Sequence, residues 1–473
     1  MNTSIVNYSY VNKKSNLRFD AEYYHPFYLR YEKIIGNKPN NFISLSGLGL
    51  KIDASAFYPS LEPYYSLGDM PFLRVLDINT KIDYDNCITI PHSIFKKYKT
   101  LKKGKLGDIV ITKGGSIGRI GLLEKESALC RDVIFINSSK LPQRDYVFLF
   151  YYCITDIYQN LLVRSSSMTA QPHLTLTLVK DIPIFRPRDD FKELILKIHL
   201  LSEKKYNLSR VLFKKSQKYL VSELGIQDWE PRHTLTFVKN YFDAKEADRI
   251  DAEYFQPKYD EIYNIIRQYN HGFDSLENLV EIRDDNYQPE ENKIYNYIEL
   301  ADIGNNGEII NHTQAVGLDL PSRARRMVKN KDLIVSSIEG SLDKIAIIPQ
   351  DHDSSLCSTG FFVMHSDKIE IEVLFIFLKT VAGLLQLKRG CSGTILTAIS
   401  KNELNKIVVP RLDPHLQNNI KQMITKSFSL NTISNSLLEI AKKGVEIAIE
   451  EDEVIAEKWI KSEISKAGIN INT

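Results

Sequence analysis

The heptapeptide DAEYYHP at residues 20–26 returns as DAEYFQP at residues 251–257, an offset of 231 positions. Other pairs of short segments follow in the same order, and their offset drifts only between 224 and 231. They include Leu45 with Leu276, Asp77 with Asp302, Asp108 with Asp332, Gly115 with Gly340, Cys130 with Cys357, Ile182 with Ile407, and Ser209 with Ser434. Such a long repeat period indicates a duplicated domain rather than a solenoid of short repeats.

The composition is that of an ordinary globular protein. The 473 residues are 43% hydrophobic and 25% charged, which is enough apolar material for two cores. The net charge is only +2, so any nucleic-acid contact must come from local basic patches. The five cysteines form no CxxC motif, and neither a charged-then-apolar leader nor an 18-residue apolar run occurs. We therefore expect a soluble protein of the reducing cytoplasm.

Both halves show the same order of predicted elements. An aromatic-rich amphipathic stretch opens each copy, at residues 19–35 and 250–269, with a proline near the expected helix start. A short helix is predicted later in each copy, near residues 145–162 and 370–387. Between them, β-branched runs bounded by Gly, Asn and Asp predict strands at residues 72–78, 108–112, 133–136, 297–300, 332–336 and 360–364. Each half is therefore expected to be an α+β domain.

A long helix is predicted after each domain, because apolar residues keep a three-four spacing over residues 191–220 and 416–449. A helix of about 35 residues is about 50 Å long, so its narrow apolar stripe suits a second helix better than one domain. We expect the two helices to form an antiparallel coiled coil; the alternative is an interrupted helical hairpin on each module. The expected boundaries are 1–187 and 239–411 for the domains, 188–238 for the first helix and linker, and 412–473 for the second helix and tail.

The segment DIVITKGGSIGRIG at residues 108–121 is rich in glycine but lacks the GxxxxGK[ST] pattern of a phosphate-binding P-loop. One interpretation is a tight β-hairpin in which glycines supply positive φ. The functional interpretation is that Lys113, Ser116 and Arg119 project from the turn toward a phosphate, joined by Lys344 from the corresponding turn of the second copy.

A basic stretch precedes this segment in each copy. Lys99, Lys102 and Lys105 correspond to Arg323, Arg326 and Lys329 at an offset of 224. The three-residue spacing would place each set on one face of a helix. A charge run is often only a solvated face, but charge of one sign in both copies favours contact with nucleic-acid phosphates.

Small hydroxyl-rich loops led by arginine form a third candidate. Their side chains could bond to phosphates or base edges; the alternative is a serine or threonine turn that closes the loop. The residues are Arg164, Ser166, Thr169 and Gln171 in the first copy and Arg389, Ser392 and Thr394 in the second.

No catalytic constellation is found in the sequence. It lacks [DN]PP[FY], GxGxxG and HExxH. The ten histidines are scattered, and His173 corresponds to Ala398 in the second copy. We therefore expect no catalytic residue, no metal site and no enzymatic activity of this chain alone.

Over nearly its whole length the chain resembles the specificity subunit of type I DNA restriction–modification systems. The resemblance is carried by the paired DAEY openings, the segment GDIV…GSIG at residues 107–118, TAQPHL at 169–174, VKDIPI at 179–184, and the helix after each module. The second copy departs from this pattern at Glu339, Leu342 and Asp343, and it has Thr397 and Ala398 in place of the Pro-His pair.

In that family each module is a target recognition domain that binds one half of a split DNA sequence. The helices fix the gap between the half-sites and dock two DNA-methyltransferase (modification) subunits, and restriction/translocase subunits complete the complex. The resemblance thus implies a non-catalytic chain that binds double-stranded DNA and no membrane. It holds no cofactor of its own, with S-adenosylmethionine, ATP and Mg expected on the partner subunits.

Two other functions are compatible with the same residues. A stand-alone duplicated nucleic-acid-binding scaffold, such as a decoy that titrates modification subunits, would have the same sequence. A duplicated hydrolase with an unfamiliar site would show activity in the purified chain without partners.

Overall fold

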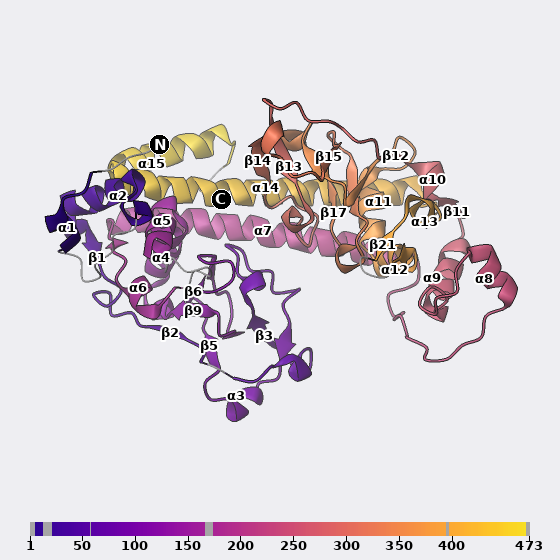
Figure 1. Ribbon diagram of the computed structural model, residues 1–473, viewed down its shortest axis with the longest axis horizontal. Helices are drawn as coiled ribbons and strands as arrows, with labels where there is room; N and C mark the ends of the chain where they lie inside the picture. The colour runs from indigo at the N-terminus through magenta and orange to yellow at the C-terminus, as the bar shows by residue number, and fades with distance from the viewer. Residues whose placement is uncertain (1–4, 13–20, 57, 166–173, 394–396, 470–473) are drawn as a thin grey trace. The chain divides into compact units, whose positions relative to one another are not determined.

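The computed structural model describes residues 5–12, 21–56, 58–165, 174–393 and 397–469 (Figure 1). It divides into two compact units that do not coincide with the two halves of the sequence. The first unit contains residues 1–204 together with residues 433–473, and the second contains residues 205–432. The first unit is therefore assembled from both ends of the chain.

Two four-stranded sheets form the first unit. One is antiparallel and has the order β2-β9-β6-β7; the other has the order β4-β3-β8-β5, with β3 and β8 parallel. The predicted strands at 108–112 and 133–136 are β6 and β9, whose β-branched side chains are almost all buried. The bounds are β2 Ile52–Ala54, β3 Met70–Leu73, β4 Thr89–Ile90, β5 Lys102–Gly104, β6 Ile109–Thr112, β7 Ile120–Leu122, β8 Ser127–Leu129 and β9 Val133–Ile136, with β1 Phe42–Ile43 paired to β10 Ile184–Phe185.

The second unit repeats the strand order of both four-stranded sheets. Its sheets have the orders β12-β19-β16-β17 and β14-β13-β18-β15, again with one parallel pair, β13 and β18. This confirms the duplication predicted from the sequence. The bounds are β12 Glu281–Arg283, β13 Ile294–Ile298, β14 Thr313–Val316, β15 Ala324–Met327, β16 Leu333–Ser336, β17 Ile345–Ile347, β18 Leu356–Ser358 and β19 Phe361–His365, with β11 Phe273–Ser275 paired to β22 Val408–Pro410 and β20 Cys391–Ser392 paired to β21 Ala398–Ile399.

The single helix predicted near residues 145–162 is two helices, and the same is true near 370–387. A threonine precedes the second helix of each pair: Thr155 donates to the carbonyl of Tyr152 at 2.6 Å, and Thr380 donates to the carbonyl of Phe377 at 2.6 Å. Each hydroxyl also accepts a backbone N–H of the following helix, as an N-cap does. The helices are α4 Gln143–Ile154 and α5 Asp156–Ser165 in the first copy, and α11 Ile371–Leu378 and α12 Val381–Arg389 in the second.

Shorter helices complete each copy. α2 and α9 both begin at the proline that follows the repeated heptapeptide opening, because proline fits the first turn of a helix. The bounds are α1 Tyr8–Asn12, α2 Pro26–Asn37, α3 Ile94–Lys97, α6 Leu176–Lys180, α8 Tyr241–Ala247, α9 Pro257–Arg267, α10 Leu276–Leu279 and α13 Lys401–Asn405.

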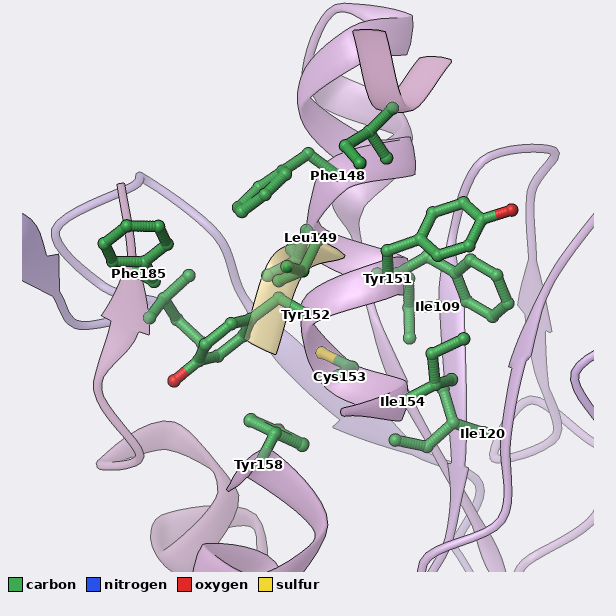
Figure 2. Packing of buried hydrophobic residues seen from close by; sticks show 14 of the residues in the cluster. Ile109, Ile120, Phe148, Leu149, Tyr151, Tyr152, Cys153, Ile154, Tyr158 and Phe185 are labelled. Atoms are coloured by element: carbon green, nitrogen blue, oxygen red, sulfur yellow. The ribbon is translucent and has the colours of Figure 1, made fainter. Parts of the chain in front are cut away.

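α4 lies at the centre of the first unit's core. All eight of its residues from 147 to 154 are buried. Figure 2 shows that its side chains leave the helix in several directions, with Phe148 toward Phe185 of β10 and Ile154 toward Ile120 of β7. The hydroxyl of Tyr152 donates to the carbonyl of Pro183 at 2.5 Å, so this buried polar group is satisfied.

The two predicted long helices are α7, Asp189–Glu223, and α14, Pro414–Glu450. Both units contain part of each helix. In the first unit Ser202 of α7 meets Ser434 of α14, and in the second unit Ser209 meets Ser427. The helices therefore run antiparallel against each other, as the coiled-coil interpretation predicted, and the alternative of separate hairpins is wrong.

The tail after α14 folds back as a further helix, α15 Glu453–Lys466. Gly444 of α14 makes room for this return, because a Cβ at this position would lie 2.4 Å from Ile460 Cδ1. Leu437, Val445, Ile460 and Ile464 join the same apolar cluster as α4. The end of the chain thus completes the core of the first unit.

Among the described residues, no helix combines the length and the apolar character needed to span a lipid bilayer.

Candidate nucleic-acid interface

The aspartates that recur in both copies hold backbone turns. Asp108 Oδ2 accepts the backbone N–H of Lys105 at 2.8 Å, and Asp332 Oδ2 accepts that of Lys329 at 2.7 Å. Both carboxylates are buried, and burial raises the pKa of Asp332 although Arg283 binds it. A second pair acts in the same way, because Asp77 accepts the N–H of Arg74, and Asp302 that of Glu299, each at 2.9 Å. These landmarks of the repeat thus stabilise the fold.

Arg164, a predicted phosphate ligand, is enclosed by the first unit. Its side chain is 4% exposed and Nη1 lies 2.7 Å from Glu32 Oε1. Nε donates to the carbonyl of Tyr23 at 2.8 Å, and the guanidinium stacks on the Tyr23 ring at 4.1 Å. The structure gives Arg164 the role of fastening the DAEY opening to α5.

Arg389, its counterpart in the second unit, has the same kind of surroundings. It lies over the rings of Tyr254 and Tyr263 at 4.7 and 4.9 Å, and Nη2 lies 3.2 Å from Asp260 Oδ1. Tyr254 occupies the place in the repeated heptapeptide that Tyr23 has in the first copy. In both copies the tyrosine of the repeated heptapeptide therefore lies against an arginine from the later segment, and the predicted phosphate contacts of these arginines stay predictions.

Arg164→Met is expected to lower the free energy of unfolding by about 3 kcal/mol, because it removes a buried ion pair and leaves the Glu32 carboxylate without this partner. Chemical denaturation monitored by circular dichroism measures the change. Arg119→Met removes the same charge from an exposed position and is expected to change stability by less than about 0.5 kcal/mol. Equal losses in the two variants would contradict the fastening role.

The glycine-rich segment forms the predicted hairpin between β6 and β7. Gly115 and Gly118 have φ of 71° and 81°, which a side chain disfavours. Thr112 braces the turn by donating to the carbonyl of Ser116 at 2.5 Å and accepting the N–H of Arg119 at 2.9 Å. Ser116 and Arg119 are exposed and Lys113 is half-buried, so the turn offers two polar side chains to a ligand.

The corresponding turn of the second unit is built differently. The hydroxyl oxygens of Ser336 and Ser341 lie 3.1 Å apart. This contact takes the place of the hydrogen bonds that Thr112 makes in the first unit. Lys344 is half-buried, and its ammonium donates to the carbonyl of Ile303 at 2.9 Å. Glu339 and Asp343 add negative charge to this turn. The two units thus present different chemistry at the same place in the fold.

The helical face predicted for the basic stretches is wrong, because both stretches run into edge strands. Lys102 lies on β5, and residues three apart in a strand point to opposite faces. Lys102 also pairs with Asp53 at 2.9 Å. Lys99 and Lys105, which flank the strand, are exposed and remain the better candidates for phosphates.

The second basic stretch contains β15, the edge strand in the second unit. Arg323 and Lys329 are exposed, whereas Arg326 is half-buried on the strand. Lys401 donates a hydrogen bond to the Asp284 carboxylate at 2.9 Å, and this bond is the main cause that lowers the pKa of Asp284. The positive charge of Arg326 lowers this pKa further. Arg323 and Lys329 are therefore the more accessible of the three predicted residues in this stretch.

The remaining predicted contacts divide into two groups. Ser392 is exposed on β20. Ser166, Thr169, Gln171 and Thr394 lie outside the described residues.

Aromatic rings accompany the lysines near β5, and these rings were not part of the sequence prediction. Lys97 donates to the Tyr64 hydroxyl at 2.6 Å and lies 5.3 Å from the centres of the Tyr64 and Tyr98 rings. Lys103 lies 5.0 Å from the ring of Phe95. Cations combined with aromatic faces suit contact with nucleic acid. The interleaved sequence FKKYKTLKK at residues 95–103 is the signal that could have revealed it.

In the part of the chain that the structure describes, no group of three or more His, Cys, Asp or Glu residues is placed to hold a metal ion. All five cysteines are free thiols.

Residues 38–199 match the family model of the type I restriction modification DNA specificity domain. Among solved structures, the chain is similar to a type I restriction–modification S subunit from M. genitalium, with 13% identity, a TM-score of 0.34, and 88% and 93% of the two chains covered. It is also similar to an HsdS subunit from Thermoanaerobacter tengcongensis, with 13% identity, a TM-score of 0.26, and 85% and 97% covered. A comparison with curated proteins found no match.

Proposed function

We propose, from the premise that residues 38–199 belong to the DNA specificity domain family of type I restriction–modification systems, that the whole chain is the specificity subunit of such a system. It recognises DNA and is not an enzyme. The observation that carries the proposal is that the matched domain is followed by a second domain with the same strand order. Each domain binds one half of a bipartite DNA target, and the long helices set the spacing between the halves.

The partners proposed for this chain are double-stranded DNA, two DNA-methyltransferase subunits that dock on the helices, and restriction/translocase subunits. S-adenosylmethionine, ATP and Mg belong to those subunits, and this chain holds no cofactor. A role on DNA places the protein in the cytoplasm. The duplication supports two methyltransferase subunits, because a duplicated chain offers each copy of a partner an equivalent surface.

Deletion of the gene in its native host, followed by a genome-wide comparison of adenine methylation, tests the proposal. We expect one split sequence motif to lose methylation, which reveals both half-sites and the gap between them. An unchanged methylation pattern would contradict the proposal and favour the decoy, and binding of the purified chain to nucleic acid would then be examined.

A domain exchange tests the assignment of one half-site to each domain. Replacing residues 40–187 with the equivalent part of a relative is expected to change one half of the methylated motif and leave the other half intact. The physical reason is that all strands of the first unit and α4 lie within this segment, so the recognition surface of one unit changes as a block. A change in both halves would refute modular recognition.

The divergent loops support this assignment. Residues 55–69 between β2 and β3 contain a 3-10 helix at Glu62–Tyr64, whereas residues 284–293 between β12 and β13 contain none. Loops of different structure on the same scaffold give two domains different partners. The half-sites are accordingly expected to differ in sequence.

A further inference from the structure

Four buried serines lie where α7 and α14 meet. In the first unit Ser202 donates to the carbonyl of Ser434 at 2.9 Å, Ser434 donates to the carbonyl of Ser202 at 2.7 Å, and the two hydroxyl oxygens are 2.9 Å apart. In the second unit Ser427 donates to the carbonyl of Ser209 at 2.8 Å, and these hydroxyls are 3.0 Å apart. All four side chains are at most 6% exposed, so their partners are protein groups.

One register of the helix pair satisfies both serine pairs. Moving seven residues forward on α7, from Ser202 to Ser209, moves seven residues back on α14, from Ser434 to Ser427. Seven residues are one repeat of a coiled coil. The two pairs are thus successive polar layers of a single antiparallel register.

The apolar residues of the same helices discriminate registers less strictly. Ile195 and Ile198 on α7 and Ile420 and Ile424 on α14 are buried, and aliphatic side chains can replace one another when a helix slides by one repeat. A slide in one direction would place Ser209 opposite Ile420 and Ser434 opposite Ile195, so these two buried serines would lose their hydroxyl partners. A slide in the other direction would place Ser202 opposite Ala441, which has no hydroxyl to pair with it.

We propose that the pairs Ser202–Ser434 and Ser209–Ser427 fix the register of the helix pair and thereby determine which gap between DNA half-sites the protein accepts. This inference rests on the proposed function. A single polar residue in a coiled-coil interface can select one register, because any other register leaves it unpaired. A slide by one repeat moves a helix by about 10 Å, which is about three base pairs of DNA.

Lys81 adds a link between this contact and the first domain. Its ammonium donates to the hydroxyl of Ser434 at 2.6 Å and to Asn435 Oδ1 at 2.8 Å. Lys81 lies in the segment between β3 and β4, so the first domain holds α14 at the level of the serine pair. The register of α7 against α14 is therefore coupled to the position of the first domain on α14.

Two complementary double variants test the proposal. Ser202→Ala with Ser427→Ala removes one hydroxyl from each pair, and Ser209 and Ser434 can then pair with each other only after a slide by one repeat. Ser209→Ala with Ser434→Ala has the opposite effect, since Ser202 and Ser427 pair only after a slide in the other direction. Ser216→Ala is the matched control, because Ser216 is equally buried and donates to the carbonyl of Phe213 in its own helix at 2.7 Å.

The measurement is the affinity of the complete methyltransferase complex for duplexes that carry both half-sites with the gap varied one base pair at a time. In both double variants, the ratio of the affinity at the wild-type gap to the affinity at other gaps is expected to fall at least tenfold. The gaps that the two variants bind best are expected to be displaced in opposite directions. Ser216→Ala is expected to keep the wild-type preference. Unchanged gap preference in both double variants, or an equal loss in Ser216→Ala, would overturn the proposal.

Binding to duplexes with a single half-site separates this role from folding. The double variants are expected to bind each half-site alone as tightly as the wild-type complex does. A loss of single-site binding would show that the serines act through domain stability and would also overturn the proposal. If the wild-type complex preferred no gap at all, the proposed function itself would fail, and the register inference would fail with it.

Discussion

Ile460→Asp is expected to unfold the first unit, although residue 460 lies near the end of the chain. Ile460 is fully buried in the cluster that contains α4, β6 and β9. A carboxylate there would lose its hydration without gaining a partner, which costs more than about 4 kcal/mol. Hydrogen exchange resolved by peptide is expected to show lost protection in β6 and β9, while β16 and β19 of the second unit stay protected.

Ile455→Asp is the matched control for this experiment. It introduces the same carboxylate on the same helix, but Ile455 is 42% exposed. We expect its exchange pattern to resemble that of the wild-type protein. If Ile460→Asp left β6 and β9 protected, the tail would not be part of the first unit's core.

Replacing Lys99, Lys102 and Lys105 together with alanine is expected to weaken DNA binding by about tenfold or more at low salt. The loss should be the same for specific and unrelated duplexes, because phosphate contacts carry no sequence information. The slope of log affinity against log salt is expected to fall by up to about 0.9 for each contact removed. Lys102 should contribute least, since Asp53 already neutralises it.

A charge-matched triple variant on α15 controls for the general effect of losing three cations. Lys458, Lys461 and Lys466 are exposed, and Lys466 pairs with Glu463 at 2.6 Å much as Lys102 pairs with Asp53. Their replacement is expected to leave affinity and salt dependence nearly unchanged. Loss of selectivity at unchanged affinity in the first triple variant would contradict the phosphate role.

The parts of the fold that were predictable are those with a strong local period. The strands at 108–112 and 332–336 were found at Ile109–Thr112 and Leu333–Ser336, because buried β-branched runs have few other conformations available. The long helices α7 and α14 followed from a three-four apolar spacing sustained over some 30 residues. The duplication was visible because aspartates that hold equivalent turns, Asp108 and Asp332 among them, stand at matching positions in both copies.

The features that were not predictable depend on contacts between distant residues. Polar loops led by Arg164 and Arg389 indicated an exposed site, but Tyr23 and Tyr254 draw both arginines inward. The spacing of Lys99, Lys102 and Lys105 fitted a helix face, yet pairing with β8 makes the middle of this stretch a strand. The return of α15 onto α14 depends on the space at Gly444, and a single glycine in a helical pattern does not indicate which residue will fill that space.

The placement of residues 433–473 in the first unit has a consequence for synthesis of the protein. As the chain leaves the ribosome, residues 205–432 emerge in full before the segment that completes the first core, so the second unit is the first that can fold to completion. The first domain must wait, with part of its apolar surface uncovered, until the last helix is released. A nascent chain cut short by a stop codon in this last segment would therefore keep that surface exposed to chaperones and proteases.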